Sequence, residues 1–143
     1  MHFIRVVLLL ILTSLAAWAD LAITLTPGAQ LANRETETIF SGTLTNTGST
    51  DIFLNDISFN LISATSTYFT VDRNFFFASV PGVLSPGETY SGPIFKMSVL
   101  KAPLGSYTGT VSILGGSDIF AQSSLPTVPF TVQVAHRPPK RIR

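Results

Sequence analysis

The amino-acid sequence predicts an all-β protein, a two-sheet antiparallel sandwich of about seven or eight strands. Short runs of alternating apolar and polar residues recur along the chain, with turn residues between them. Thr and Ser dominate the polar positions of these runs, which favours strands over helices. No segment has the apolar spacing of an ordinary helix, and a length of 143 residues allows one domain.

Residues 1–19 are predicted to be a secretory signal peptide. Arg5 supplies positive charge, Val6–Leu12 is an unbroken apolar run, and Ala17–Ala19 places small residues before a cleavage site. The apolar stretch is shorter than the about 20 residues that span a bilayer, although an uncleaved anchor is the alternative. We therefore expect an exported chain that begins at Asp20, lies in the periplasm or outside the cell, and keeps no transmembrane anchor after cleavage.

Charge divides the remaining chain into a body, residues 20–135, and a flexible basic tail, residues 136–143. The body has four basic and eight acidic residues, whereas the tail has four basic ones. The tail is interpreted either as a solvated terminus or as an attachment to anionic lipid or polysaccharide that weakens with salt. Nucleic acid is not an expected partner of this acidic, exported body. The basic tail residues are Arg137, Lys140, Arg141 and Arg143.

Strands are predicted wherever the period-two pattern is clear. Leu21–Leu25 ends at Pro27-Gly28, and a strand through Phe40 and Leu44 ends at Asn46–Ser49, where Asn and Gly tolerate positive φ. Further strands are predicted within Thr67–Val71, Phe95–Val99, Tyr107–Ile113 and Phe130–Val134.

Two places depart from simple alternation. In the apolar run Ile52–Leu61, Ile52 and Leu54 have one phase whereas Phe53 and the later apolar residues have the other, which predicts a bend or bulge near Asn55. A short helical turn is expected at Asp72–Ser79.

Three local strings predict turns and close packing. Pro86 fixes φ and Gly87 accepts positive φ, which predicts a type II turn. Gly115-Gly116 closes a strand where a side chain would clash. Tyr107 is expected to bury its ring and to donate its hydroxyl to a loop carbonyl, as in a tyrosine corner.

These strings resemble secreted bacterial immunoglobulin-like domains, of the kind found in exported proteins that carry a PEP-CTERM sorting signal. The resemblance covers roughly Leu21–Val134 and implies an immunoglobulin-like sandwich. No hydrophobic helix precedes Arg143, so the resemblance does not imply membrane anchoring. It is carried by Asn46–Gly48, Leu84–Glu88, Tyr90–Phe95, Pro103–Val111 and Ile113–Gly116.

No catalytic, cofactor-binding or metal site is expected. His2 and His136 lie outside the body and the chain has no cysteine, so the body lacks an imidazole or thiol for nucleophilic or general-base catalysis. Glu35 and Glu37 would share one face of a strand, but a solvated pair explains them better than a glycosidase site. A loop calcium site is an alternative without an acidic loop to support it; its candidate ligands are Asp51, Asp56 and Asp118.

The string Phe75-Phe76-Phe77 is a candidate partner contact, together with the basic tail. Three consecutive aromatic side chains cannot share one face of a strand. They either cap an open end of the sandwich or expose an apolar patch to a partner such as a surface protein.

We expect an exported, non-catalytic module with a structural or adhesive role at the bacterial surface or in the extracellular matrix. A glycan-binding module is one alternative, weakened because the only tryptophan, Trp18, lies in the predicted signal. A subunit that assembles by strand exchange is another, and it requires an exposed groove in the sheets.

Processing is open to a direct test. N-terminal sequencing of exported protein should give Asp20 as the first residue, because Ala17 and Ala19 occupy the small-residue positions. Exported protein that begins at Met1 would contradict the signal-peptide interpretation.

Overall fold

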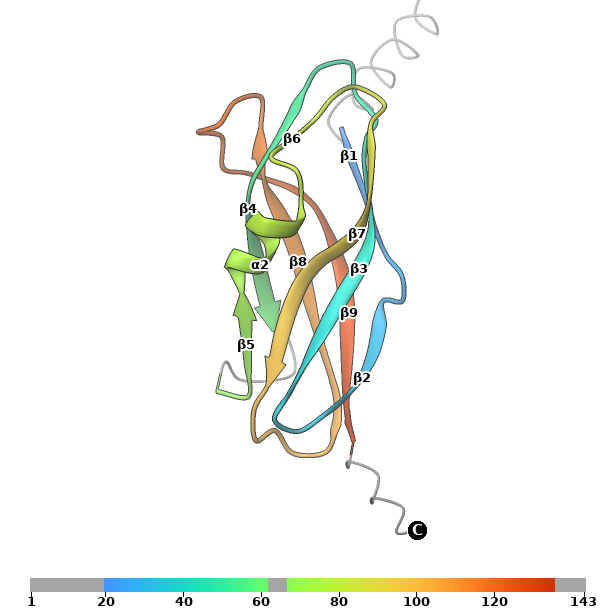
Figure 1. The fold of residues 1–143 in the computed structure, drawn as a ribbon, viewed down its shortest axis with the longest axis vertical. Helices are drawn as coiled ribbons and strands as arrows, with labels where there is room; N and C mark the ends of the chain where they lie inside the picture. The colour runs from blue at the N-terminus through green and yellow to red at the C-terminus, as the bar shows by residue number, and fades with distance from the viewer. Residues whose placement is uncertain (1–19, 62–66, 136–143) are drawn as a thin grey trace, which may run out of the picture.

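The computed structural model describes residues 20–61 and 67–135, so the predicted signal and basic tail lie outside the described residues. Two packed sheets form the body (Figure 1), which confirms the predicted all-β sandwich. The first sheet has the order β1 (Leu21–Leu25), β3 (Thr36–Asn46), β7 (Thr89–Val99), β5 (Phe69–Asp72). The second has the order β2 (Ala29–Asn33), β9 (Ser123–Ala135), β8 (Gly105–Gly116), β4 (Ile52–Leu61), β6 (Val83–Leu84).

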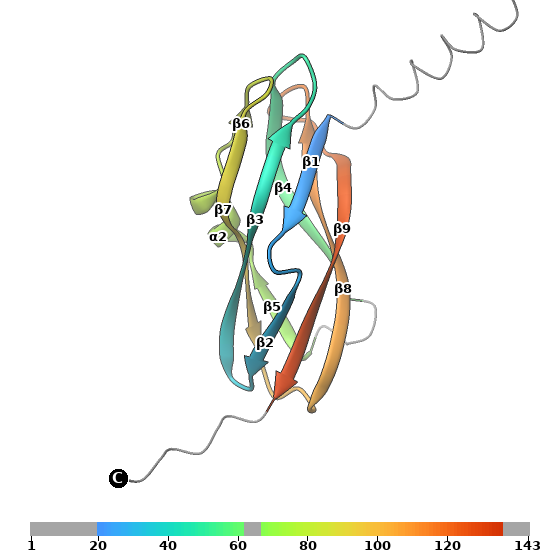
Figure 2. The same cartoon turned by 90° about the vertical axis from the view of Figure 1, so that its right-hand side faces the viewer.

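The first strand region passes from one sheet to the other. The Thr26–Pro27 peptide bond is cis, and the chain leaves β1, which pairs antiparallel with β3, to form β2 on the opposite sheet. There β2 pairs parallel with β9, from Ala29↔Thr131 to Asn33↔Ala135 (Figure 2). The predicted break at Pro27-Gly28 is therefore confirmed, but the strand that follows was not predicted, and one pairing is parallel where an antiparallel sandwich was expected.

Phenylalanine rings fill the space between the sheets. Phe40 and Phe95 stack with ring centroids 4.7 Å apart, and the Phe130 ring meets each of them edge-on at 5.5 Å. Phe130 also lies against Gly109, where an added Cβ would come within 2.7 Å of the ring. The inward phase predicted for these strands is confirmed, because Phe40, Phe95 and Phe130 are all buried.

The predicted bulge in β4 is present at Asn55. The register with β8 runs from Leu54↔Gly115 directly to Asp56↔Leu114, so Asn55 is the extra residue. This shift brings Ile57, Phe59 and Leu61 onto the same inward face as Leu54, which reconciles the two phases of the sequence pattern. At Gly115 an added Cβ would lie 1.8 Å from the Phe53 carbonyl oxygen, as the predicted clash requires.

The turns differ in their physical basis. Gly87 has φ of 79° and the Glu88 N–H donates to the Ser85 carbonyl at 2.9 Å, which confirms the type II turn. The Asn46–Ser49 turn is present, but no residue in it has positive φ. The reason is a side-chain bond instead, because the Gly48 N–H donates to Asn46 Oδ1 at 2.9 Å.

Asn46 joins three separate segments at one end of the sandwich. Its side chain is fully buried, and Nδ2 donates to the carbonyls of Thr50 at 2.8 Å and Leu84 at 2.9 Å. Its backbone N–H donates to the Glu88 carbonyl at 3.0 Å, and its carbonyl accepts from Gly87 at 2.9 Å. The Asn46 side chain thereby anchors the turn after β3 and strand β6, and its backbone anchors the turn before β7.

The helical turn predicted at Asp72–Ser79 is α2 (Arg73–Ser79), which begins immediately after β5. Asp72 is its N-cap, and Asp72 Oδ1 accepts from the Phe75 N–H at 3.2 Å. The helix packs against β7 and β4 and so bridges the open side of the two sheets.

Tyr107 makes the predicted backbone bond, since its hydroxyl donates to the Pro103 carbonyl at 2.7 Å. The ring meets Phe69 edge-on with centroids 5.1 Å apart. It is half-buried rather than fully buried, because β8 begins close to the end of the sandwich.

Replacement of Asn46 should be far more costly than replacement of an exposed asparagine. Asn46→Ala leaves the buried Leu84 carbonyl and the part-buried Thr50 carbonyl without their donor and the Gly48 N–H without its acceptor, so the free energy of unfolding should fall by about 3 kcal/mol. Asn60→Ala, an exposed position on β4, should change it by less than about 0.5 kcal/mol. Urea titration of both variants measures the difference; equal stabilities would show that Asn46 does not hold this end together.

Candidate functional site

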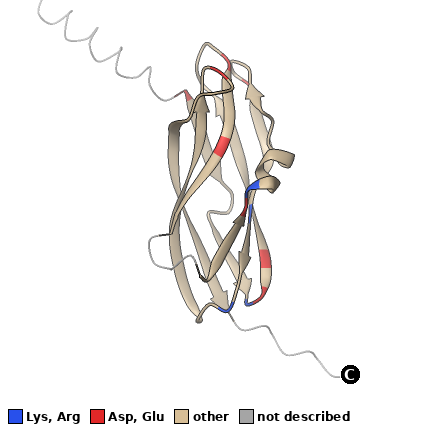
Figure 3. Cartoon of the chain, turned by 90° about the vertical axis from the view of Figure 1, so that its left-hand side faces the viewer, with Lys and Arg blue, Asp and Glu red and all other residues tan. Residues whose placement is uncertain are grey.

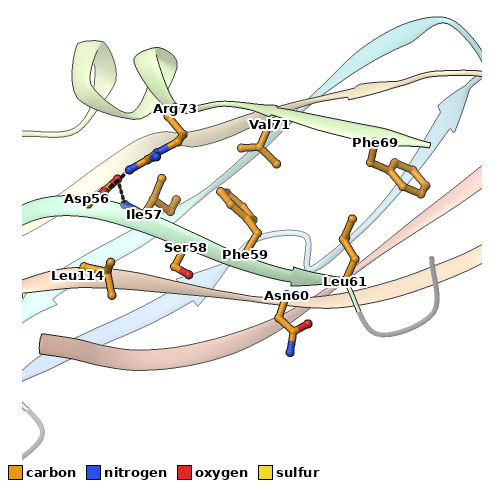
Figure 4. A pocket seen from close by; sticks show the side chains of 10 residues that line it. All are labelled: Asp56, Ile57, Ser58, Phe59, Asn60, Leu61, Phe69, Val71, Arg73 and Leu114. Carbon is orange, nitrogen blue, oxygen red and sulfur yellow. Dashed lines mark hydrogen bonds and ion pairs between the residues drawn. The ribbon is translucent and has the colours of Figure 1, made fainter. Parts of the chain in front are cut away.

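The strongest candidate site is a groove of about 550 Å³ between β4 and β5, on the open side of the sandwich. Figure 4 shows its walls, which are the apolar side chains of the two strands, with Asp56 and Arg73 at one end. The wall residues are Ile57, Phe59 and Leu61 on β4 and Phe69 and Val71 on β5.

The groove exists because β6 is short. Strand β6 pairs with β4 only at Ile52 and Phe53, and the Gly82 carbonyl accepts from the Leu54 N–H at 2.9 Å. Beyond this point, β4 pairs with β8 on one side and with no described strand on the other. On the opposite sheet β5 is also an edge strand, and β7 is the one described strand with which it pairs. Two strand edges without a second described partner therefore flank the groove.

An ion pair closes the end of the groove where β5 passes into α2. An Arg73 guanidinium N–H donates to Asp56 Oδ2, and the Ile57 N–H donates to Asp56 Oδ1 at 2.7 Å. Partial burial alone would raise the pKa of Asp56, but the hydrogen bonds from Arg73 and Ile57 and the charge of Arg73 outweigh it, so the pKa lies below its ordinary value. The carboxylate raises the pKa of Arg73 in return. Both groups are therefore charged at neutral pH.

Charge elsewhere on the body is sparse. Basic residues lie near the start of α2 and at the end of the sandwich from which β9 leaves the fold (Figure 3). Lys96 Nζ lies 3.6 Å from both Glu37 Oε2 and Asp72 Oδ2. Exposed ion pairs of this kind contribute little to stability.

The aromatic string Phe75-Phe76-Phe77 lies on α2 and is divided by it. Phe76 is buried in the core, Phe75 is half-buried with Lys96 Nζ 5.5 Å from its ring centroid, and Phe77 is 52% exposed. This placement divides the string between the two interpretations, because Phe76 is buried on the open side of the sandwich whereas Phe77 is exposed to solvent. The other predicted contacts, Arg137, Lys140, Arg141 and Arg143, lie outside the described residues.

The acidic candidates do not converge. Glu35 has φ of 62° in the turn before β3, whereas Glu37 is on the strand, so the expected pair on one face is not formed. Within residues 20–61 and 67–135, no three His, Cys, Asp or Glu side chains lie close enough to hold a metal ion. Asp56 is paired with Arg73, and Asp118 Oδ1 accepts from the Phe120 N–H at 2.9 Å.

One exposed apolar pair was missing from the sequence predictions. Ile119 is 62% exposed and Phe120 83% exposed, in the connection between β8 and β9. Asn55 Nδ2 holds this connection through the carbonyls of Asp118 at 2.9 Å and Ala121 at 2.8 Å. The predicted bulge residue and these two apolar side chains are thus parts of one local structure.

Comparison with known proteins identifies the fold but finds no close relative. No protein-family model matches the sequence, and neither does any curated protein. Among solved structures, part of Escherichia coli alpha-2-macroglobulin is similar, with a TM-score of 0.51 and 13% identity over 82% of this chain and 7% of that one. The PapD-like domain 7 of human CEP192 (TM-score 0.48, 11% identity) matches 87% of this chain and 89% of its own, and the Caenorhabditis elegans MSP family member WR4 (0.45, 9%) matches 79% and 97%.

Similarity at this level of identity concerns the fold alone. Together with the sheet orders β1-β3-β7-β5 and β2-β9-β8-β4-β6, it defines the chain as an immunoglobulin-like β-sandwich module.

The Asp56–Arg73 pair predicts a particular dependence of stability on pH. Because the pKa of Asp56 is lower in the folded chain than its ordinary value of 3.8, the charged carboxylate stabilises the fold above that pH, and the contribution is lost as pH falls through the folded pKa. Asp56→Asn should lower the free energy of unfolding at pH 7 by at most about 1 kcal/mol, since Arg73 is largely exposed to solvent.

The difference in the free energy of unfolding between wild type and Asp56→Asn should shrink as the pH is lowered below 3.8. Thermal unfolding between pH 2 and 8 measures it, and Asp51→Asn, which removes an exposed carboxylate outside the groove, is the control. A difference that stays constant across this range would contradict the role of the charged pair.

Proposed function

We propose that this chain is an exported, non-catalytic immunoglobulin-like module with a structural or adhesive role at the cell surface or in the extracellular matrix. It contacts its partner through the β4–β5 groove. The observation that supports this most directly is the groove itself, which presents half-buried apolar side chains beside an unpaired strand edge.

The chemistry of the groove favours binding over catalysis. Among the described lining residues, Asp56 and Arg73 are the ionisable ones, and they form an ion pair with each other. A general base or nucleophile needs an ionisable group free to accept or lose a proton near neutral pH, and the described lining residues offer none.

Export is supported by the predicted signal at residues 1–19. Across the two described ranges, no helix has the length and apolar character needed to cross a membrane.

The free edge of β4 also favours the strand-exchange alternative, in which a partner contributes a strand to the fold. A glycan-binding module has less support from the groove. Its aromatic walls are Phe59 and Phe69; Phe69 is buried, and the Phe59 ring packs edge-on against Phe95 with centroids 5.0 Å apart. Neither ring offers the flat, open platform on which a sugar stacks.

A matched pair of substitutions on β5 tests this function. The full chain is expressed in a secreting bacterial host, and its location is measured by fractionation and by antibody labelling of intact cells. Retention of those cells on a coated surface under flow then measures adhesion. Val71→Glu places a charge in the groove and should reduce retention to that of cells lacking the protein, whereas Thr70→Glu, exposed on the same strand, should leave it unchanged.

Protein that remains in the cytoplasm would contradict the proposal, as would equal retention with Val71→Glu and Thr70→Glu when both variants melt as wild type. Deletion of residues 136–143 gives the remaining comparison. Loss of retention on this deletion, with Val71→Glu unaffected, would assign the contact to the basic tail instead.

A further inference from the structure

The backbone of β4 beside the groove is oriented to accept another strand. The Ile57 N–H does not point toward β8, since it donates to Asp56 Oδ1 at 2.7 Å. Backbone groups along a strand alternate in direction, so Phe59 and Leu61 direct their N–H and C=O groups to the same outer side as Ile57. No described strand pairs with this side of β4 after Phe53.

The usual protection of an exposed edge is missing from this segment. Edge strands are commonly guarded by Lys, Pro or an inward-pointing charge. From Ile57 to Leu61 the sequence is Ile-Ser-Phe-Asn-Leu, with no charge and no proline. Its apolar residues alternate and line the groove, so an added strand would form main-chain bonds with β4 and insert alternate side chains between the sheets. Five residues give a strand of about 17 Å.

The charge at the end of the groove selects the chemistry of the occupant. Asp56 has a side chain only 18% exposed and already accepts from two donors. The Arg73 side chain is 57% exposed and has five N–H donors, of which Asp56 uses part. An acidic side chain is therefore accommodated beside Arg73, and a basic one is not. Along the rest of the walls, only uncharged side chains avoid burying an unpaired charge.

The geometry points to an extended peptide segment of another polypeptide that adds to the free edge of β4 as an antiparallel strand. Its inward positions are apolar, apolar and acidic, with the acidic side chain beside Arg73. The antiparallel direction follows the pairing of β4 with both β6 and β8, and antiparallel pairing is the more stable arrangement per residue. This inference rests on the proposed function, for which it names the partner class.

Two blocked peptides of identical composition test the direction and the pattern. Acetyl-Thr-Val-Thr-Val-Thr-Glu-Thr-amide places Glu beside Arg73 when it lies antiparallel to β4, and the reversed sequence places Glu at the opposite end. Titration of each into isotope-labelled full-length chain, followed by backbone NMR, should give saturable binding of the first peptide below about 1 mM. The amide signals of Phe59 and Leu61 should shift and their hydrogen exchange should slow, and the reversed peptide should bind several-fold more weakly.

Two controls separate strand addition from unspecific apolar contact. N-methylation of the central Val removes one main-chain donor and should weaken binding about tenfold, equivalent to about 1.4 kcal/mol. Replacing the peptide Glu with Gln should weaken binding to wild type about threefold but should not affect binding to Arg73→Gln. Lys101→Gln, which removes an exposed cation outside the groove, should behave as wild type.

Several results would overturn the inference. These are no binding at 1 mM, equal binding of the N-methylated peptide, or preference for the reversed sequence. If the amide signals of Phe59 and Leu61 shift on addition of cellohexaose but not on addition of either peptide, the groove is a glycan-binding site. If peptides fail to bind while Val71→Glu still abolishes cell retention, strand addition is wrong and the adhesive role stands. If the first peptide binds as expected but Val71→Glu leaves cell retention unchanged, strand addition stands and the adhesive role is wrong.

Discussion

The hydrogen bonds of Asn46 are the interaction on which the extent of the β4–β5 groove depends. A buried amide with every polar atom satisfied is stable, whereas the same site with its amide removed leaves backbone groups without partners. Through Leu84 this residue fixes β6, and the two-residue contact of β6 with β4 decides where β4 loses its second neighbour. The start of the groove is thus set by a side chain outside it.

The open side of the sandwich contributes to the core and also has a strand edge without a described partner. Phe59 packs edge-on against Phe95 in the core, yet its strand keeps an outward edge without a described partner. Helix α2 and the pair Asp56–Arg73 cover the upper part of this side, and Phe76 fills the space beneath the helix. The part of this side that no described residue covers is short, apolar and bounded by a charged group, and these features favour the proposed selective contact over unspecific aggregation at a strand edge.

Features encoded by neighbouring residues could be predicted from the sequence. The phase change around Asn55 and the helical turn at Asp72–Ser79 are local signals, and both predictions are confirmed. Strand β2 could not be found, because Ala29–Asn33 lacks alternating apolar residues and gains its structure from β9, about one hundred residues later.

The groove was hidden for a related reason. The Pro86-Gly87 turn predicts where β6 ends, but no local pattern states that this two-residue strand pairs with the start of β4. The exposure of Phe120 depends on bonds from Asn55 that span more than sixty residues. Long-range pairing decides such features, and a single sequence records it only indirectly.

The crossing of the first strand region has a mechanical consequence. The chain enters the sandwich at one end through β1 and leaves at the other through β9 (Figure 2), while β2 and β9 run in the same direction. Tension between the two ends of the body therefore loads the β2–β9 ladder in shear, so its hydrogen bonds must break together instead of one at a time. A module of this topology resists pulling through its rate of forced unfolding more than through its equilibrium stability.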